Sequence, residues 1–192
     1  MHAMADTTPV RARPGRPAQL SRELIVAAAL QGNLETLTMR ELADRLGVSH
    51  AALYRWVDSR DALFDLVSEV MIERILPADE PRGAQWRPWL RRVAWAMHDQ
   101  FTAVPGYAGR LARPHRHNPE ALARLHNAVV RAFIGAGLGP ELAEQSWYIF
   151  VTCVVGWLAT QEAPLNLGHT QPRFELFLDT LLRGLPARNS SQ

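Results

Sequence analysis

The stretch GVSHAALYRWV, residues 47–57, gathers polar and aromatic side chains in a short segment that begins with a glycine. Tyr54, Arg55 and Trp56 are consecutive, so no single face of a helix or strand can bury all three. Arginine and tyrosine donate hydrogen bonds to phosphate, and aromatic rings make apolar contact with sugars or thymine methyl groups. Together the three residues indicate binding to nucleic acid. Taken alone, each aromatic residue is equally compatible with a partly buried ring, and Arg55 with a solvated charge.

The residues just before this group suit the reading of base edges. His50 can donate or accept a hydrogen bond, and the small side chains of Ala51 and Ala52 leave clearance in a major groove roughly 12 Å wide. Leu53 and Val57 are then the inward face of the same short helix. The sequence therefore predicts a recognition helix whose N-terminal part faces the bases and whose later residues contact the DNA backbone.

A second short helix must hold the recognition helix in place. Thr38 and Glu41 form a T-x-x-E capping box that predicts its start, and Gly47 predicts its end. Ser49 is the expected cap of the recognition helix. Two short helices joined by Gly-Val-Ser form a helix-turn-helix pattern. Their expected shared core is Leu42, Ala43, Leu46, Val48, Leu53 and Val57.

The rest of the chain reads as helices, and no extended run alternates in the manner of a strand. Ser21 caps a first helix with Leu24, Ile25, Ala28 and Ala29 at inward spacing. We predict an all-α fold, with a three-helix helix-turn-helix DNA-binding domain followed by a larger helical ligand-binding and dimerisation domain. The expected parts are a flexible basic arm at 1–19, the DNA-binding domain at 20–76, the larger domain at 86–186 and a disordered tail at 187–192.

Composition limits the class of protein. The 192 residues are 47% hydrophobic, which excludes a mainly disordered chain. All 21 basic residues are arginines, so the pI of about 9.2 reflects the absence of lysine more than an affinity for nucleic acid. No signal-like segment opens the chain, no apolar run approaches the length of a membrane span, and Cys153 stands alone. We therefore expect a cytoplasmic protein with no membrane association.

Arginines also mark the N-terminal arm. Arg11, Arg13 and Arg16 lie among proline and glycine in the stretch up to residue 19, and RPGRP at 13–17 is similar to the core of minor-groove-binding hooks. The alternative is a disordered tail that only keeps the chain soluble.

The stretch LTMRELADRLGVSHAALYRWVDSRDALFDLV, residues 37–67, resembles the N-terminal domain of the TetR family of bacterial one-component regulators. The resemblance implies that Tyr54 contacts phosphate, that Arg40 reaches DNA and that Arg60 replaces a phosphate-binding lysine. Trp56 stands where the family more often has histidine. The predicted DNA contacts are Thr38, Arg40, Ser49, His50, Ala51, Ala52, Tyr54, Arg55, Trp56 and Arg60.

The C-terminal half favours a homodimer. Residues 146–159 are apolar nearly all round, and residues 173–185 carry a second apolar stripe. The resemblance implies that these last two helices pair with their counterparts in a second subunit; a buried monomer core is the alternative.

An aromatic-rich set in the larger domain is the expected effector site, although stripes at helical spacing can also be ordinary core. Apolar walls with few polar groups suit a small apolar or aromatic molecule. His115 and His117 are read as loop histidines, so we expect no metal site and no cofactor. The resemblance leaves one alternative open, a metal-chelated ligand, because the tetracycline-repressor branch of the family binds a drug–magnesium complex through a histidine. The predicted effector contacts are Trp95, His98, Phe101, Tyr107, Trp147 and Phe150.

We therefore expect a ligand-responsive transcription factor, most simply a repressor, that binds a near-palindromic double-stranded DNA operator as a homodimer and is released by its effector. Two alternatives stay open. One is an architectural DNA-binding protein without effector; the other is a small helical enzyme, although no nucleophile elbow or phosphate-binding loop is present.

Overall fold

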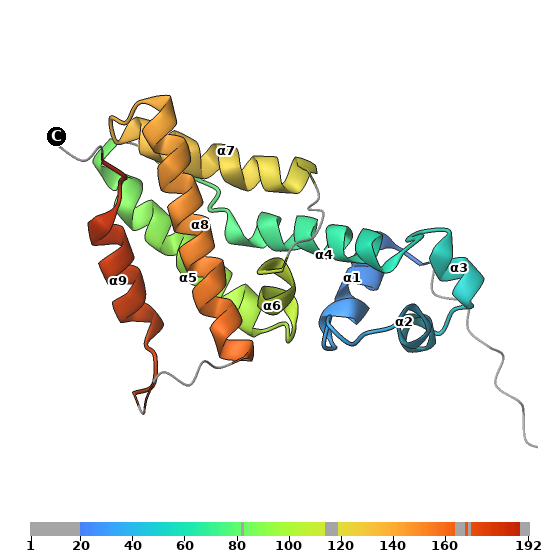
Figure 1. The fold of residues 1–192 in the computed structure, drawn as a ribbon. Helices are drawn as coiled ribbons and strands as arrows, with labels where there is room; N and C mark the ends of the chain where they lie inside the picture. Colours follow the sequence, from blue (N-terminus) through green and yellow to red (C-terminus); the bar gives the residue numbers. More distant parts are fainter. Residues whose placement is uncertain (1–19, 82, 114–118, 164–167, 169, 189–192) are drawn as a thin grey trace, which may run out of the picture.

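The computed structural model describes residues 20–81, 83–113, 119–163, 168 and 170–188, and all regular structure within them is helical (Figure 1). The all-α prediction is confirmed for these ranges. The basic arm at 1–19, the loop histidines His115 and His117 and the last four residues lie outside the described part of the chain.

The small domain contains α1 (Arg22–Leu30), α2 (Met39–Leu46) and α3 (His50–Tyr54), followed by α4 (Arg60–Ile75). The predicted caps are present. The Ser21 hydroxyl accepts from the Leu24 N–H, and Thr38 and Glu41 form both hydrogen bonds of the capping box. Gly47 ends α2 with φ 64°, a left-handed conformation that glycine adopts without steric cost. These local signals determine where each helix of the small domain begins and ends.

A continuous core joins the small domain to α4. The fully buried residues include Ile25, Leu42, Leu53 and Val67, one from each of the four helices. Leu24 differs from the expectation, because it is 44% exposed and Val26 is buried in its place. The turn of α1 that faces α4 is therefore displaced by about one residue from the predicted stripe.

The larger domain surrounds α5 (Trp86–Thr102), which follows a short 3-10 turn at Gly83–Gln85. Around it lie α6 (Tyr107–Leu111), α7 (Pro119–Gly135), α8 (Pro140–Glu162) and α9 (Phe174–Gly184) (Figure 1). Helix α4 runs from the small domain into this bundle and packs against α1 at one end and against α5 and α7 further along. One helix thus contributes to both domains.

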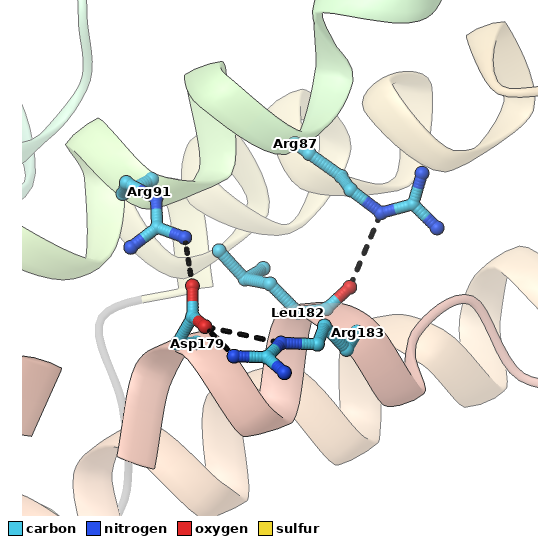
Figure 2. Close-up of polar contacts among 5 residues, drawn as sticks. All are labelled: Arg87, Arg91, Asp179, Leu182 and Arg183. Atoms are coloured by element: carbon cyan, nitrogen blue, oxygen red, sulfur yellow. Dashed lines mark hydrogen bonds and ion pairs between the residues drawn. The ribbon is translucent and has the colours of Figure 1, made fainter. Parts of the chain in front are cut away.

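Polar contacts attach α9 to α5 across a separation of about ninety residues in sequence. Figure 2 shows Asp179 accepting from Arg91 at 2.7 Å and from Arg183 on its own helix, while Arg87 donates to the Leu182 carbonyl at 3.2 Å. The two guanidinium groups hold the pKa of Asp179 below its ordinary value, with Arg183 as the larger cause. The chain beyond α9 is also anchored, because the Ala187 N–H donates to Ser146 at 2.8 Å. Ala187, the first residue of the expected tail at 187–192, is thus held against α8.

Helix α8 is apolar over most of its length, but much of it lies on the surface. Tyr148 is 65% exposed and Ile149 37% exposed, and Leu176 on the neighbouring α9 is 55% exposed. Within the described ranges α8 is the one helix long and apolar enough to cross a membrane by length and composition, with a mean hydropathy of 1.2 over its most apolar window. Only 28% of that window is buried, so α8 exposes an apolar surface.

Replacing Gly47 by alanine tests the turn between α2 and α3. We expect the free energy of unfolding to fall by about 1 kcal/mol, because alanine is strained at positive φ. Urea denaturation followed by circular dichroism measures the change. Gly135→Ala is the matched control, since that glycine ends α7 without positive φ and has open space where a Cβ would lie. Equal stability of the two variants would contradict this account of the turn.

Candidate functional site

Helix α3 and the turn after it present their polar residues to solvent because two apolar residues face inward, Leu53 in the helix and Val57 three residues beyond its end. Leu53 is fully buried and Val57 is 4% exposed. On the outer face Tyr54 is 40% exposed and Trp56 54% exposed, which is high for large aromatic side chains. Helix α3 ends at Tyr54, so Trp56 lies in the turn that follows it. Tyr54 and Trp56 can therefore lie close together in sequence because both are exposed, and neither has to fit into the core.

Five further predicted DNA contacts are exposed or partly exposed in the same domain. His50 and Ala51 are exposed at the start of α3, Ala52 is half-buried beside them, and Arg55 is exposed after the helix. Arg40 is exposed on α2. The His50 and Tyr54 rings lie one helical turn apart with centroids 4.5 Å from each other, so they form one polar and aromatic surface.

Three other predicted contacts already have partners within the protein. The hydroxyl of Thr38 accepts from the Glu41 N–H at 3.2 Å, and that of Ser49 accepts from the Ala52 N–H at 3.2 Å. The Arg60 guanidinium donates to the Leu34 carbonyl at 3.0 Å and also to the Glu35 carbonyl. Arg60 therefore stabilises the loop between α1 and α2, and a phosphate contact from it would require this side chain to move.

The larger domain contains an apolar cavity of about 510 Å³ between α4, α5, α6, α7 and α8. This volume is within the range of sites for small molecules. The described lining carries no charged side chain. It consists of Ser68, Ile72, Ile75, Met97, Phe101, Tyr107, Leu111, Ala112, Ala121, Leu122, Leu125, Trp147, Tyr148, Val151, Thr152, Val155 and Gly156.

Half of the predicted effector contacts line this cavity, namely Phe101, Tyr107 and Trp147. Trp95 and His98 lie on another side of α5, where the Phe174 ring of α9 is 5.0 Å from Trp95 and 4.7 Å from His98. Both residues lie off the buried stripe of α5 that includes Trp89, Val93 and Met97, so they face α9 rather than the cavity.

Phe150 is likewise outside the lining. It is 1% exposed, on the inner face of α8 that also buries Val154 and Leu158. The cavity face of α8 instead carries Trp147, Val151 and Val155.

Sequence reasoning missed the contribution of α4 to the cavity. Ser68, Ile72 and Ile75 form part of its wall, although residues 20–76 were assigned to DNA binding alone. One signal was available: Ser68 directly follows Val67 in the apolar stripe of α4, and the structure leaves it only 9% exposed. A buried serine in an apolar helix has to find a polar partner.

That partner is Tyr107 at the start of α6. Its hydroxyl lies 3.2 Å from the Ser68 hydroxyl, and both residues line the cavity. Burial raises the pKa of Tyr107 well above its ordinary value, and the hydrogen bond to Ser68 opposes this only in part, so the phenol stays neutral. The pair connects α4 to α6 inside the cavity.

Outside the cavity, α6 and its approach contact the small domain directly. The Leu34 N–H donates to the Pro105 carbonyl at 3.0 Å, Arg113 lies 2.7 Å from Glu35, and Arg110 pairs with Asp61. Gly106 turns the chain there with φ 81°, and a Cβ at this position would lie 2.8 Å from the Glu35 backbone. The small domain thus rests on the same short helix that closes one side of the cavity.

Comparisons with known proteins agree with both halves of this architecture. The family model "Bacterial regulatory proteins, tetR family" matches residues 25–67. The chain is 36% identical over 180 residues to the class C tetracycline repressor protein of Escherichia coli, a match that covers 90% of this chain and 80% of that protein. The chain belongs to the TetR family. It is therefore a ligand-responsive transcriptional repressor that acts as a homodimer, in a family of DNA-binding regulators rather than enzymes.

Solved structures of TetR-family proteins share the fold. The Streptomyces coelicolor TetR family protein ActR in complex with actinorhodin is 27% identical, with a TM-score of 0.66, over 76% of this chain and 70% of that one. BioQ with its double-stranded DNA operator is 21% identical, with a TM-score of 0.68, over 88% of this chain and 100% of that one.

An ion pair next to the cavity orients one of its aromatic walls in this TetR-family chain. His126 on α7 lies 2.7 Å from Glu144 on α8, and its ring meets that of Trp147 edge-on at 5.3 Å. The hydrogen bond to Glu144 is the main cause that raises the pKa of His126 above its ordinary value. The pair therefore connects α7 and α8 most strongly when the imidazole is protonated.

The pH dependence of stability tests this pair. A raised pKa in the folded state gives stability that is fully present below the unfolded value of about 6.5 and is lost as the pH rises through the folded value. We expect Glu144→Gln to lower the melting temperature measurably at about pH 5.5 and to have almost no effect at about pH 8.5. His126→Gln should reproduce the same profile. A loss of equal size at both pH values would contradict the assignment.

Proposed function

We propose that each subunit of the dimer places α3 in the major groove of one operator half-site, and that an effector in the apolar cavity releases the DNA. The observation that carries this proposal is the double role of α4. Its first half packs in the small domain, with Leu63 3% and Val67 0% exposed, and its second half forms cavity wall through Ile72 and Ile75. A ligand that shifts α4 necessarily shifts the domain that carries α3.

On the DNA side, the exposed surface of the small domain separates into two roles. His50 and Ala51 at the start of α3 face the bases, because the first turn of a recognition helix lies deepest in the groove. Arg40, Tyr54 and Arg55 contact phosphate, since their polar ends are exposed at the edge of this surface. Trp56 adds apolar contact with sugar or thymine methyl groups.

The exposed apolar faces of α8 and α9 form the dimer contact in this proposal. Tyr148, Ile149 and Leu176 are exposed on neighbouring helices that already pack against each other. Two such pairs from a symmetric dimer form a four-helix seam. That seam sets the separation of the two recognition helices, which must be about one turn of DNA for two half-sites to be bound at once.

Release requires that the effector bind the conformation that does not fit DNA more tightly than the one that does. An apolar or aromatic small molecule suits the uncharged described lining. ActR has been solved with actinorhodin and TetR from Acinetobacter baumannii with minocycline, both in structures of this fold. An architectural protein without effector would show no ligand-induced thermal shift in a screen of small molecules.

We also place the protein in the cytoplasm.

Substitutions on the exposed face of the small domain test the DNA contacts. Against an operator selected from random duplexes, we expect Arg40→Ala to weaken binding at least tenfold, and Tyr54→Phe about threefold, because charged phosphate contacts contribute more than neutral ones. Fluorescence anisotropy measures the affinity. Arg131→Ala is the matched control, since Arg131 is an exposed arginine on α7 in the larger domain. Unchanged affinity in either test variant, with fold and dimer intact, would contradict its assignment.

Deletion of residues 1–18 tests the arginine-bearing arm. Each arm brings Arg11, Arg13 and Arg16, and the dimer has two arms, so the deletion should weaken operator binding and make the dependence of log affinity on log salt shallower by about five. Binding is measured over a series of salt concentrations. A deletion variant with the affinity and salt slope of the full chain would remove the arm from the DNA interface.

A further inference from the structure

The apolar cavity has very few polar groups that could recognise part of a ligand. In the described lining, the Thr152 hydroxyl donates a hydrogen bond to the Tyr148 carbonyl of its own helix, at 2.6 Å. Tyr148 itself is mostly exposed, so it lies at the edge of the cavity. The remaining hydroxyls are those of Ser68 and Tyr107, and both residues are at least nine-tenths buried.

The Ser68–Tyr107 pair has more hydroxyl hydrogens than it uses in hydrogen bonds. Two hydroxyl groups carry two donor hydrogens, and the single hydrogen bond between Ser68 and Tyr107 uses one of them. Within the described residues neither hydroxyl has another hydrogen-bond partner, so one buried O–H has no acceptor whichever way the first bond runs. The great majority of buried donors in proteins have a hydrogen-bond acceptor. Here the donor without one is the hydroxyl of either Ser68 or Tyr107, and both residues line the cavity.

Resting on the proposed function, we propose that the effector is an uncharged, mainly apolar molecule with a carbonyl-type oxygen that accepts the free O–H of the Ser68–Tyr107 pair. The pair thereby fixes the orientation of the ligand, while Phe101, Met97 and Ile72 contact its apolar body. The site discriminates by complementarity: a hydrocarbon of the same shape leaves the donor unsatisfied, and the acceptor oxygen satisfies it.

The described lining also explains why the ligand is uncharged. No arginine, histidine or carboxylate is present on it to neutralise an ionised group. A carboxylate that enters such a cavity loses its hydration and meets only neutral donors in the described lining, which cannot compensate for the loss. The same molecule with a ketone in place of the carboxylate loses far less hydration on entry.

The position of the donor connects recognition to release. Ser68 belongs to α4 and Tyr107 to α6, which also supports the small domain through Arg110 and Asp61. A ligand oxygen that accepts a hydrogen bond from the Ser68–Tyr107 pair is thus a third polar group between α4 and α6. It therefore acts at the place where the cavity is nearest to the elements that hold α3.

Three compounds with one ring skeleton test the proposal: fluorene, 9-fluorenone and fluorene-9-carboxylate. Binding to the full-length protein is followed by quenching of tryptophan fluorescence, since Trp147 lines the cavity. We expect 9-fluorenone to bind roughly fivefold more tightly than fluorene, because it completes one neutral hydrogen bond, and the carboxylate to bind more weakly than either. In the double variant Ser68→Ala/Tyr107→Phe, which removes both hydroxyl groups of the pair, that ketone preference should fall to about onefold, while fluorene still binds.

Thr160→Val is the matched control for loss of a helix hydroxyl. Thr160 donates to the Trp157 carbonyl on α8, outside the lining, so this variant should keep the ketone preference. Melting curves show whether each variant is folded. A ketone that binds no better than fluorene, including no binding of either, overturns the proposal. So does a carboxylate that binds more tightly, or a ketone preference that survives in the Ser68→Ala/Tyr107→Phe double variant. Because operator binding is measured separately, any of these results leaves the DNA-binding function standing.

Discussion

The structure depends on α4 belonging to two hydrophobic cores at once. Its first turns bury Leu63 and Val67 against the small domain, and its later turns bury Met71 and Ile75 among helices of the larger one. A close-packed helix cannot move at one end without repacking at the other, because cores of this density have few alternative arrangements. In the proposed mechanism, a change in the cavity therefore reaches α3 through a movement of α4, which packs in both domains.

The second connection, through α6, makes this coupling more specific. Helix α6 is only five residues long, yet it contacts the side of α4 and the end of α8, and Pro105 just before it accepts from the Leu34 N–H in the loop after α1. Glu162 of α8 accepts from the Gly109 N–H at 2.6 Å, which holds this short helix in place. Such a short helix has little stability of its own, so the elements packed around it determine its position. It is a suitable element for sensing whether the cavity is filled.

Much of the small domain could be predicted from the sequence because its signals are local. The capping box at Thr38 and Glu41 and the glycine at 47 act within a few residues of themselves, and all are present as expected. The exposed positions of Tyr54 and Trp56 followed from the need to bury Leu53 and Val57. The burial of Leu24 was predicted incorrectly, because the angle at which α1 meets α4 depends on contacts far away in sequence.

The sequence by itself determined that the chain is helical, where its first three helices begin, and that Tyr54 and Trp56 are exposed, since capping and hydrophobic periodicity are properties of neighbouring residues. Only the tertiary structure decided what lines the cavity. Trp95 and His98 turned towards α9, whereas Ser68, on a helix assigned to DNA binding, turned inward to meet Tyr107. The physical reason is that a cavity wall is formed by residues from five helices. Their relative rotations are set by packing, which no local pattern contains.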